Sequence, residues 1–195
     1  MQINPFFSPD FRIVLGSASP RRQELMKSLN LPFEVRIQSS DESFPADLAT
    51  EIVPLFIANQ KKIALLDGLK DDEMLITVDT VVVLENEIIG KPTNEAEAFL
   101  MLKKLSGKKH RVISGVCMYA KHKEVQFSEF TDVYFKTLSD DEIAYYIENY
   151  RPLDKAGSYG IQEWLGMMGI HRIEGCFYNV MGLPVSKVYE TLKDF

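Results

Sequence analysis

Residues 12–22 read RIVLGSASPRR. The short β-branched run at 12–16 predicts a buried strand. The small residues that follow predict a turn, and Ser19 and Pro20 suit the N-cap and the first position of a helix. A strand, a tight turn and a helix start therefore fall within a dozen residues, as in an α/β fold.

The rest of the chain alternates helices and strands first, and strands dominate its middle. Predicted helices begin near Pro54 and Pro184, and at two capping patterns, Asn94 with Glu97 and Ser139 with Glu142. Predicted strands cover 33–38, 74–78, 81–84, 110–120, 125–135, 170–174 and 177–180, with a break at Asp79-Thr80, a hairpin turn at Glu85-Asn86 and a polar turn at 121–123. This order predicts an α/β fold with a mixed twisted sheet flanked by helices.

Composition excludes several classes of protein. The 195 residues are 46% hydrophobic and 26% charged, which is typical of a globular chain with a real core rather than a disordered one. The net charge of −6 argues against a general nucleic-acid binder. No apolar run approaches the ~20 residues that span a bilayer, and the first residues lack a signal-peptide pattern. We expect a cytoplasmic protein with no membrane or nucleic-acid partner.

The turn at 16–22 has the features of an anion site. Backbone N–H groups converge after the strand, and the helix adds its positive N-terminal end. Ser17 supplies a hydroxyl, and Arg21 and Arg22 stand where cations oppose the helix dipole. A bound phosphate would offset that cost. The alternative is an exposed helix start with solvated arginines.

Three further segments carry polar groups that suit chemistry. Asp79 interrupts an apolar run, and a carboxylate there needs a hydrogen bond, a counter-ion or a metal; the alternative is an Asp that satisfies a local turn. Lys91 follows a predicted hairpin. The segment DKAGSYGIQ, 154–162, places Lys155 among small residues and ends on Gln162, whose amide suits a base edge. Its alternative is a glycine loop with an ordinary salt bridge.

Four motifs together resemble one family. LGSASPRRQELM, TVDTVV followed by GKP, PLDKAGSYGIQ and NVMGLPV occur in the order of the Maf family of nucleoside triphosphate pyrophosphatases. The resemblance implies a single domain over 1–195, with an inosine-triphosphatase-like fold and a cleft between two lobes. It also implies hydrolysis of a nucleoside triphosphate to the monophosphate and pyrophosphate, with Mg²⁺ or Mn²⁺ as cofactor. Homodimers are common in the family, so we expect one.

The resemblance also assigns the catalytic and metal-binding residues. Asp79 matches the acid regarded as the general base, and it shares the metal with an acidic residue that matches Glu42. Asp41 is the alternative to Glu42 at that position.

Phosphate contacts follow in the same way. The matching positions are Ser17, Arg22, Lys61 and Lys91. The helix motif reads IANQKKIA where the family usually has an arginine and an alanine, so Lys62 remains the alternative to Lys61.

The substrate branch depends on three positions. Arg21, Thr80 and Gln162 resemble the branch that hydrolyses dTTP and UTP. The branch that acts on 7-methyl-GTP typically has tryptophan, glutamine and glutamate there. The resemblance therefore predicts a dTTP/UTP pyrophosphatase, with a role in clearing modified pyrimidine nucleotides. The alternative is a non-catalytic nucleotide-binding regulator of septum formation and cell division.

Overall fold

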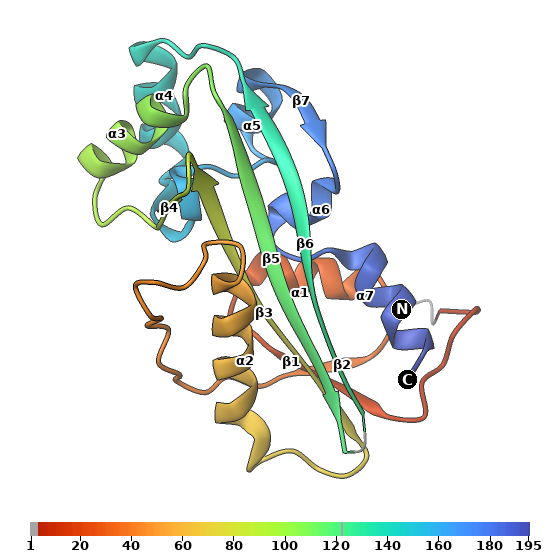
Figure 1. Ribbon diagram of the computed structural model, residues 1–195. Coiled ribbons are helices and arrows are strands. Elements are labelled where there is room, and N and C mark those ends of the chain that lie inside the picture. The colour runs from red at the N-terminus through yellow and green to blue at the C-terminus, as the bar shows by residue number, and fades with distance from the viewer. Residues whose placement is uncertain (1–3, 122) are drawn as a thin grey trace. The chain divides into compact units, whose positions relative to one another are not determined.

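The computed structural model describes residues 4–121 and 123–195 (Figure 1). His122 of the predicted turn at 121–123 lies outside the described residues, as do residues 1–3. The strands of the described part are β1 (Arg12–Gly16), β2 (Phe33–Val35), β3 (Glu73–Leu84), β4 (Glu87–Ile89), β5 (Lys109–Ala120), β6 (Lys123–Phe135) and β7 (Ile170–Glu174). Its α-helices are α1 (Pro20–Lys27), α2 (Val53–Leu66), α3 (Glu95–Leu105), α4 (Asp140–Tyr150), α5 (Trp164–Gly169), α6 (Phe177–Met181) and α7 (Val185–Lys193).

The described strands form one mixed sheet in the order β2-β1-β3-β5-β6-β7, with β4 paired to β3. β1 runs parallel to β2 and β3, whereas β4 is antiparallel to β3 and β7 is antiparallel to β6. The predicted mixed α/β class is confirmed. No helix within residues 4–121 and 123–195 is both long enough and apolar enough to cross a membrane.

The chain divides into two compact units. Unit 1 comprises Met1–Asp79, Ser114–Glu129 and Gly182–Phe195, and unit 2 comprises Thr80–Ile113 and Phe130–Met181. The strands β3, β5 and β6 contribute residues to both units. The single domain over 1–195 that the family resemblance implied stays a prediction.

In unit 1, helix α2 packs closely on the strands. A Cβ at Gly115 of β5 would lie 2.2 Å from the Leu55 nitrogen, so only glycine admits the start of the helix there. The Thr77 hydroxyl of β3 donates to the Ala58 carbonyl at 2.7 Å. Alternate residues of a strand share a face, so Asp79 follows Thr77 on the face that meets α2. There it contacts Lys61, which lies one helical turn beyond Ala58.

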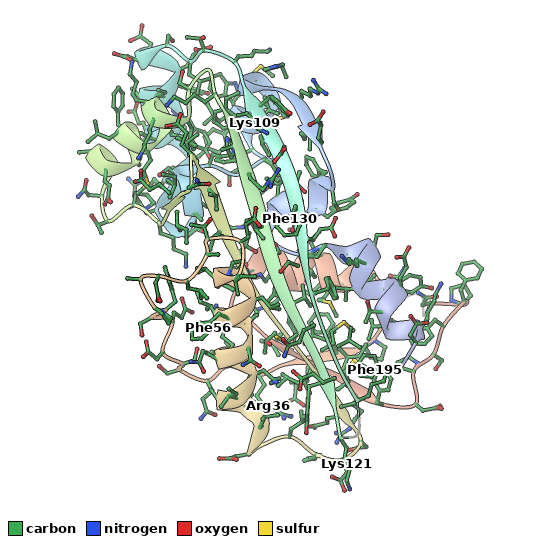
Figure 2. All side chains as sticks on the ribbon, in the orientation of Figure 1. Arg36, Phe56, Lys109, Lys121, Phe130 and Phe195 are labelled. Atoms are coloured by element: carbon green, nitrogen blue, oxygen red, sulfur yellow. The ribbon has the colours of Figure 1, made fainter. Side chains whose placement is uncertain are left out.

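An ion pair between half-buried Arg36 and buried Glu73 lies at the start of β3, in the same unit. Arg36, which is labelled in Figure 2, donates to both carboxylate oxygens of Glu73, at 2.9 and 3.1 Å. The Arg36 hydrogen bonds lower the pKa of the Glu73 carboxyl to about 2. Glu73 therefore stays ionised although it is buried.

Unit 2 holds an apolar core beneath two capped helices. Asn94 caps α3 by accepting from the Glu97 N–H at 2.9 Å, and Ser139 and Glu142 form a capping box at the start of α4. Buried Leu102, Ile143 and Tyr146 belong to the core that these helices cover. The predicted caps of both helices are confirmed.

The turn from β3 to β4 is also as predicted, since Glu85 and Asn86 both have positive φ, 51° and 68°. This is the conformation that two-residue hairpins require.

Three predicted elements were wrong. β3 runs unbroken through Asp79 and Thr80, because the Asp79 carboxylate has a lysine partner and the strand need not end to solvate it. The predicted strand at 177–180 is helix α6; a short apolar run does not distinguish the two by periodicity. β2 ends at Val35 instead of residue 38. Helix α5 was not predicted, since its sequence WLGMMG contains two glycines.

Candidate active site

The N-terminus of α1 forms as the sequence predicts. Ser19 is the N-cap and its hydroxyl accepts from the Arg22 N–H at 3.5 Å, with Pro20 at the first position. The Ser17 hydroxyl accepts from the Ser19 N–H and from the Arg22 guanidinium, both at 3.3 Å. Ser17 and Arg22, two of the predicted phosphate ligands, are therefore in contact.

The Arg22 side chain is held by the protein backbone. Its guanidinium donates to the Gly182 carbonyl at 2.8 Å and to the Val78 carbonyl at 2.9 Å. Burial lowers the pKa of Arg22 below its ordinary value, although arginine keeps its charge at neutral pH. The alternative of a solvated arginine is wrong for Arg22. The guanidinium of Arg22 is held at the carbonyl of Val78, the residue of β3 that precedes Asp79. Arg21 is half-buried and precedes Arg22 in the first turn of α1.

One lysine joins the two predicted acidic residues. The Lys61 ammonium lies 2.7 Å from Asp79 Oδ1 and 3.0 Å from Glu42 Oε1. The side chains of Lys61 and Asp79 are 17% and 14% exposed, whereas that of Glu42 is 56% exposed. The mostly buried Lys61 ammonium and Asp79 carboxylate thus face one another, and the more exposed Glu42 carboxylate is the second partner of the lysine.

The structure separates the two lysines that the sequence left as alternatives. Lys62 points to the other side of α2, where its ammonium lies 2.5 Å from Glu124 and 5.7 Å from the ring centre of Tyr119. Its side chain is 9% exposed. Lys61 is therefore the lysine that contacts Asp79.

The acidic alternatives separate in the same way. The exposed Asp41 carboxylate accepts from the Ser43 N–H at 2.8 Å, and that bond lowers the Asp41 pKa. Glu42 is the residue of this pair that contacts Lys61.

The carboxylates of Asp79 and Glu42 are suitable ligands for a small divalent ion. Residues 4–121 and 123–195 contain no group of three or more His, Cys, Asp or Glu placed to hold a metal. Mg²⁺ in nucleotide sites commonly takes one or two carboxylates and completes its shell with phosphate oxygens and water. A pair of carboxylates that share one lysine fits such an ion.

Unit 2 contains the other predicted residues. Lys91 is exposed after β4, and Thr80 is half-buried in β3. The Gly90 carbonyl accepts from the Gly157 N–H at 3.0 Å, which ties the segment before Lys91 to the 154–162 loop. Gly157 has φ 70° and lies against Val82, so this close approach requires glycine.

Gln162 has a buried atom that needs a partner. Its Oε1 has no hydrogen-bond partner among the described residues. A buried polar atom without a partner costs roughly 1–3 kcal/mol, and such atoms in native proteins call for an explanation. An acceptor held in this way suits a donor on a ligand.

Residues around Gln162 are joined by ion pairs and hydrogen bonds. Lys155 is buried and pairs with Asp154 at 2.8 Å and with Glu163 at 3.2 Å, so the salt-bridge alternative for this lysine is confirmed. The Tyr159 hydroxyl lies 2.7 Å from Nε2 of buried His110. Burial lowers the pKa of His110 to about 4, so the imidazole is neutral at pH 7. Glu163 and His110 could not be identified from the sequence, because neither belongs to a motif with a recognisable spacing.

The predicted site residues thus fall into two groups. Unit 1 brings together Ser17 with Arg22, and Lys61 with Asp79 and Glu42. Thr80, Lys91 and Gln162 belong to unit 2.

The fold and these groups define a mixed α/β protein with a lysine–carboxylate cluster and an arginine fixed by hydrogen bonds at the start of helix α1. The family model described as Maf-like protein matches residues 12–195, and the chain belongs to this family.

Curated relatives match nearly the whole chain. A protein of Parabacteroides distasonis named dTTP/UTP pyrophosphatase is 50% identical over 186 residues, 95% of this chain and 96% of its own. A protein of Porphyromonas gingivalis with the same name is 50% identical over 188 residues, 95% of this chain and 94% of its own. Among solved structures, the Staphylococcus aureus Ham1 protein aligns with a TM-score of 0.45 and 13% identity, over 64% of this chain and 71% of its own.

Proposed function

We propose that this chain hydrolyses dTTP and UTP to the nucleoside monophosphate and pyrophosphate. Relatives of that name are half identical to it along almost the whole length. The observation that carries the proposal is the cluster of Asp79, Lys61 and Glu42, with the Arg22 guanidinium bound to the carbonyl of Val78, the residue before Asp79. An acid and several cations are what cleavage of a phosphoanhydride requires.

In the proposed reaction, Asp79 accepts a proton from the attacking water. Lys61 orients the carboxylate through the 2.7 Å contact. Ser17, Arg22, Lys61 and Lys91 bind the phosphates and stabilise the negative charge that develops on the departing pyrophosphate. The hydrogen bonds of Arg22 to two backbone carbonyls hold its charge in place before substrate arrives.

Asp79 and Glu42 are the residues that would hold a Mg²⁺ or Mn²⁺ ion. When bound, such an ion neutralises part of the charge of a triphosphate. The chain itself has a net charge of −6, so it must gather its cations where the phosphates bind.

Base selection is assigned to Arg21, Thr80 and Gln162. Uracil and thymine each present an N3–H donor between two carbonyl acceptors, and a glutamine amide offers the complementary acceptor and donor. The buried Oε1 of Gln162, which has no protein partner in the described chain, supports this assignment.

We also propose a homodimer in the cytoplasm. Both cysteines, Cys117 and Cys176, are free thiols, as suits a reducing compartment. Large apolar side chains are exposed on α5 and α6 of unit 2, among them Met167 and Tyr178, and an interface would cover such groups. Light scattering of the purified protein measures the assembly state.

The activity is tested by pyrophosphate release from dTTP, UTP, CTP, GTP and 7-methyl-GTP, with Mg²⁺, Mn²⁺ or EDTA. We expect turnover of dTTP and UTP that EDTA abolishes. Turnover of 7-methyl-GTP alone would contradict the assignment of Arg21, Thr80 and Gln162. Nucleotide binding without turnover would favour the regulator of cell division.

A further inference from the structure

Gln162 lies inside a four-residue turn whose two ends are bound by one tyrosine. The Glu163 N–H donates to the Gly160 carbonyl at 3.0 Å and closes the turn around Ile161 and Gln162. The hydroxyl of buried Tyr146 accepts from the Gly160 N–H at 2.9 Å and donates to Glu163 Oε2. Both ends of the turn therefore depend on the Tyr146 hydroxyl and on the carboxylate that it meets.

The Glu163 carboxylate has a second partner. Its Oε1 lies 3.2 Å from the ammonium of Lys155, and the side chains of Glu163 and Lys155 are 20% and 9% exposed. Glu163 is the N-cap residue of α5, yet its side chain makes no capping hydrogen bond with that helix. The carboxylate is thus directed to the loop that carries Gln162 and away from the helix it begins.

Close packing leaves this turn little freedom to move. A Cβ at Gly160 would lie 2.7 Å from Glu163 Cδ, so the Glu163 side chain rests directly on the turn. A Cβ at Gly166 of α5 would lie 1.9 Å from the Ile161 carbonyl oxygen, so the helix closes the turn from another side. Ile161 itself is buried. The turn is bound at both ends, while the amide oxygen of Gln162 keeps no protein partner in the described chain.

We propose that Glu163 is a positioning residue for pyrimidine recognition: by bridging Lys155 and Tyr146, it holds the turn so that the Gln162 amide meets the base in a fixed orientation. The inference rests on the proposed role of Gln162. A side chain that is ordered before the nucleotide binds loses less entropy on binding, and this raises affinity for the matching base without any new contact. A base that does not pair with the amide gains nothing from that order.

Two substitutions remove the bridge in different ways. Glu163→Ala deletes the carboxylate, and Tyr146→Phe deletes the hydroxyl that joins Gly160 to Glu163. Glu163→Gln keeps an acceptor for Tyr146 and is the conservative variant. The matched controls are Glu148→Ala, an exposed glutamate of α4, and Tyr145→Phe, the neighbouring exposed tyrosine. Thermal unfolding verifies that each variant is folded, and Tyr146→Phe serves as the test if Glu163→Ala does not fold.

The measurement is kcat and KM for UTP and GTP in each variant, alone and combined with Gln162→Ala. We expect Glu163→Ala and Tyr146→Phe to lower kcat/KM for UTP by roughly tenfold, mainly through KM, because the Gln162 amide would then have to be ordered when the base binds. GTP and both control variants should change little, and Glu163→Gln should recover part of the loss. In the Gln162→Ala background, removal of Glu163 should have no further effect.

Three outcomes would overturn the inference. Equal losses for UTP and GTP would mean that Glu163 only supports the fold, and losses that multiply in the double variant would mean that it does not act through Gln162. Both results leave the proposed function standing. A Gln162→Ala variant with an unchanged UTP:GTP ratio would instead overturn the role of Gln162, and the inference with it.

Discussion

The predicted residues of unit 1 and unit 2 satisfy their polar groups in opposite ways. In unit 1 the Lys61 ammonium pairs with both Asp79 and Glu42, and Arg22 is bound to two backbone carbonyls. In unit 2 the Gln162 oxygen is buried without a partner in the described chain, although its neighbours Lys155, Tyr146 and Glu163 are all bonded.

Physical cost explains the difference. An unpaired charge away from water costs several kcal/mol, whereas an unpaired neutral amide costs roughly 1–3 kcal/mol. The charged residues of unit 1 therefore pair with one another in the protein itself. The unpaired amide oxygen of Gln162 costs less free energy than an unpaired charge would. We infer that the cluster of Lys61 and Asp79 in unit 1 performs the chemistry and that Gln162 of unit 2 takes part in selecting the base.

The largest expected effect comes from Asp79→Asn, which removes the proposed base and keeps the side-chain shape. Loss of a general base typically lowers the rate ~10²–10⁴-fold. We expect kcat for dTTP and UTP to fall within this range, with little change in thermal unfolding. Asp67→Asn, at the exposed end of α2, is the control. Wild-type kcat in Asp79→Asn would remove Asp79 from the reaction.

Lys61 and Lys62 are neighbours in α2, and their substitutions separate an effect on activity from an effect on stability. Lys61→Met should lower kcat/KM by ~10–100-fold, because a phosphate contact and the orientation of Asp79 are both lost. Lys62→Met should instead lower the free energy of unfolding by about 1–3 kcal/mol, since it leaves the carboxylate of Glu124 without its close partner.

Pyrophosphate release and chemical denaturation measure the two effects separately. The reverse pattern, with activity lost in Lys62→Met and retained in Lys61→Met, would show that the wrong lysine has been assigned to the site.

The smallest expected effect concerns the pH dependence of unit 2. The His110 pKa is lowered from 6.5 to about 4, so below pH 6.5 the unfolded chain binds a proton that the folded chain does not. Stability from this group is therefore complete above pH 6.5 and is lost as the pH falls. Between pH 7.5 and 5 we expect the free energy of unfolding to drop by about 2 kcal/mol.

Urea denaturation at both pH values measures the drop. In His110→Gln the free energy of unfolding should change little between the two pH values. In His171→Gln, which replaces an exposed histidine on β7, it should fall as in the wild type. An equal drop in wild type and His110→Gln would assign the pH dependence to other groups.

Much of the fold could be predicted from local rules. Caps at Ser19, Asn94 and Ser139 and the Glu85-Asn86 turn are determined by neighbouring residues, and all four are confirmed. The unbroken course of β3 could not be predicted, because it depends on Lys61, 18 residues away in sequence, reaching Asp79. Helix α6 could not be predicted for the same reason. It contains buried Asn179, whose amide donates to the Val112 carbonyl of β5 and to the Thr131 hydroxyl of β6.

The same limit applies to the site. The motifs identified Asp79, Arg22 and Gln162 as candidates, but which of Lys61 and Lys62 meets the acid depends on the rotation of α2 against β3. Glu163 had no motif, and its importance follows only from its contacts with Lys155 and Tyr146. Gly160, three residues before Glu163, is a local sign of close packing.

The most direct test of the division of roles between Lys61 and Gln162 is the ratio of kcat/KM for UTP to that for GTP. We expect Lys61→Met to lower both values by the same factor and leave the ratio unchanged, whereas Gln162→Ala should lower the UTP value alone and reduce the ratio by roughly tenfold. A ratio that changes in Lys61→Met, or that is unchanged in Gln162→Ala, would contradict the separation of chemistry from base selection.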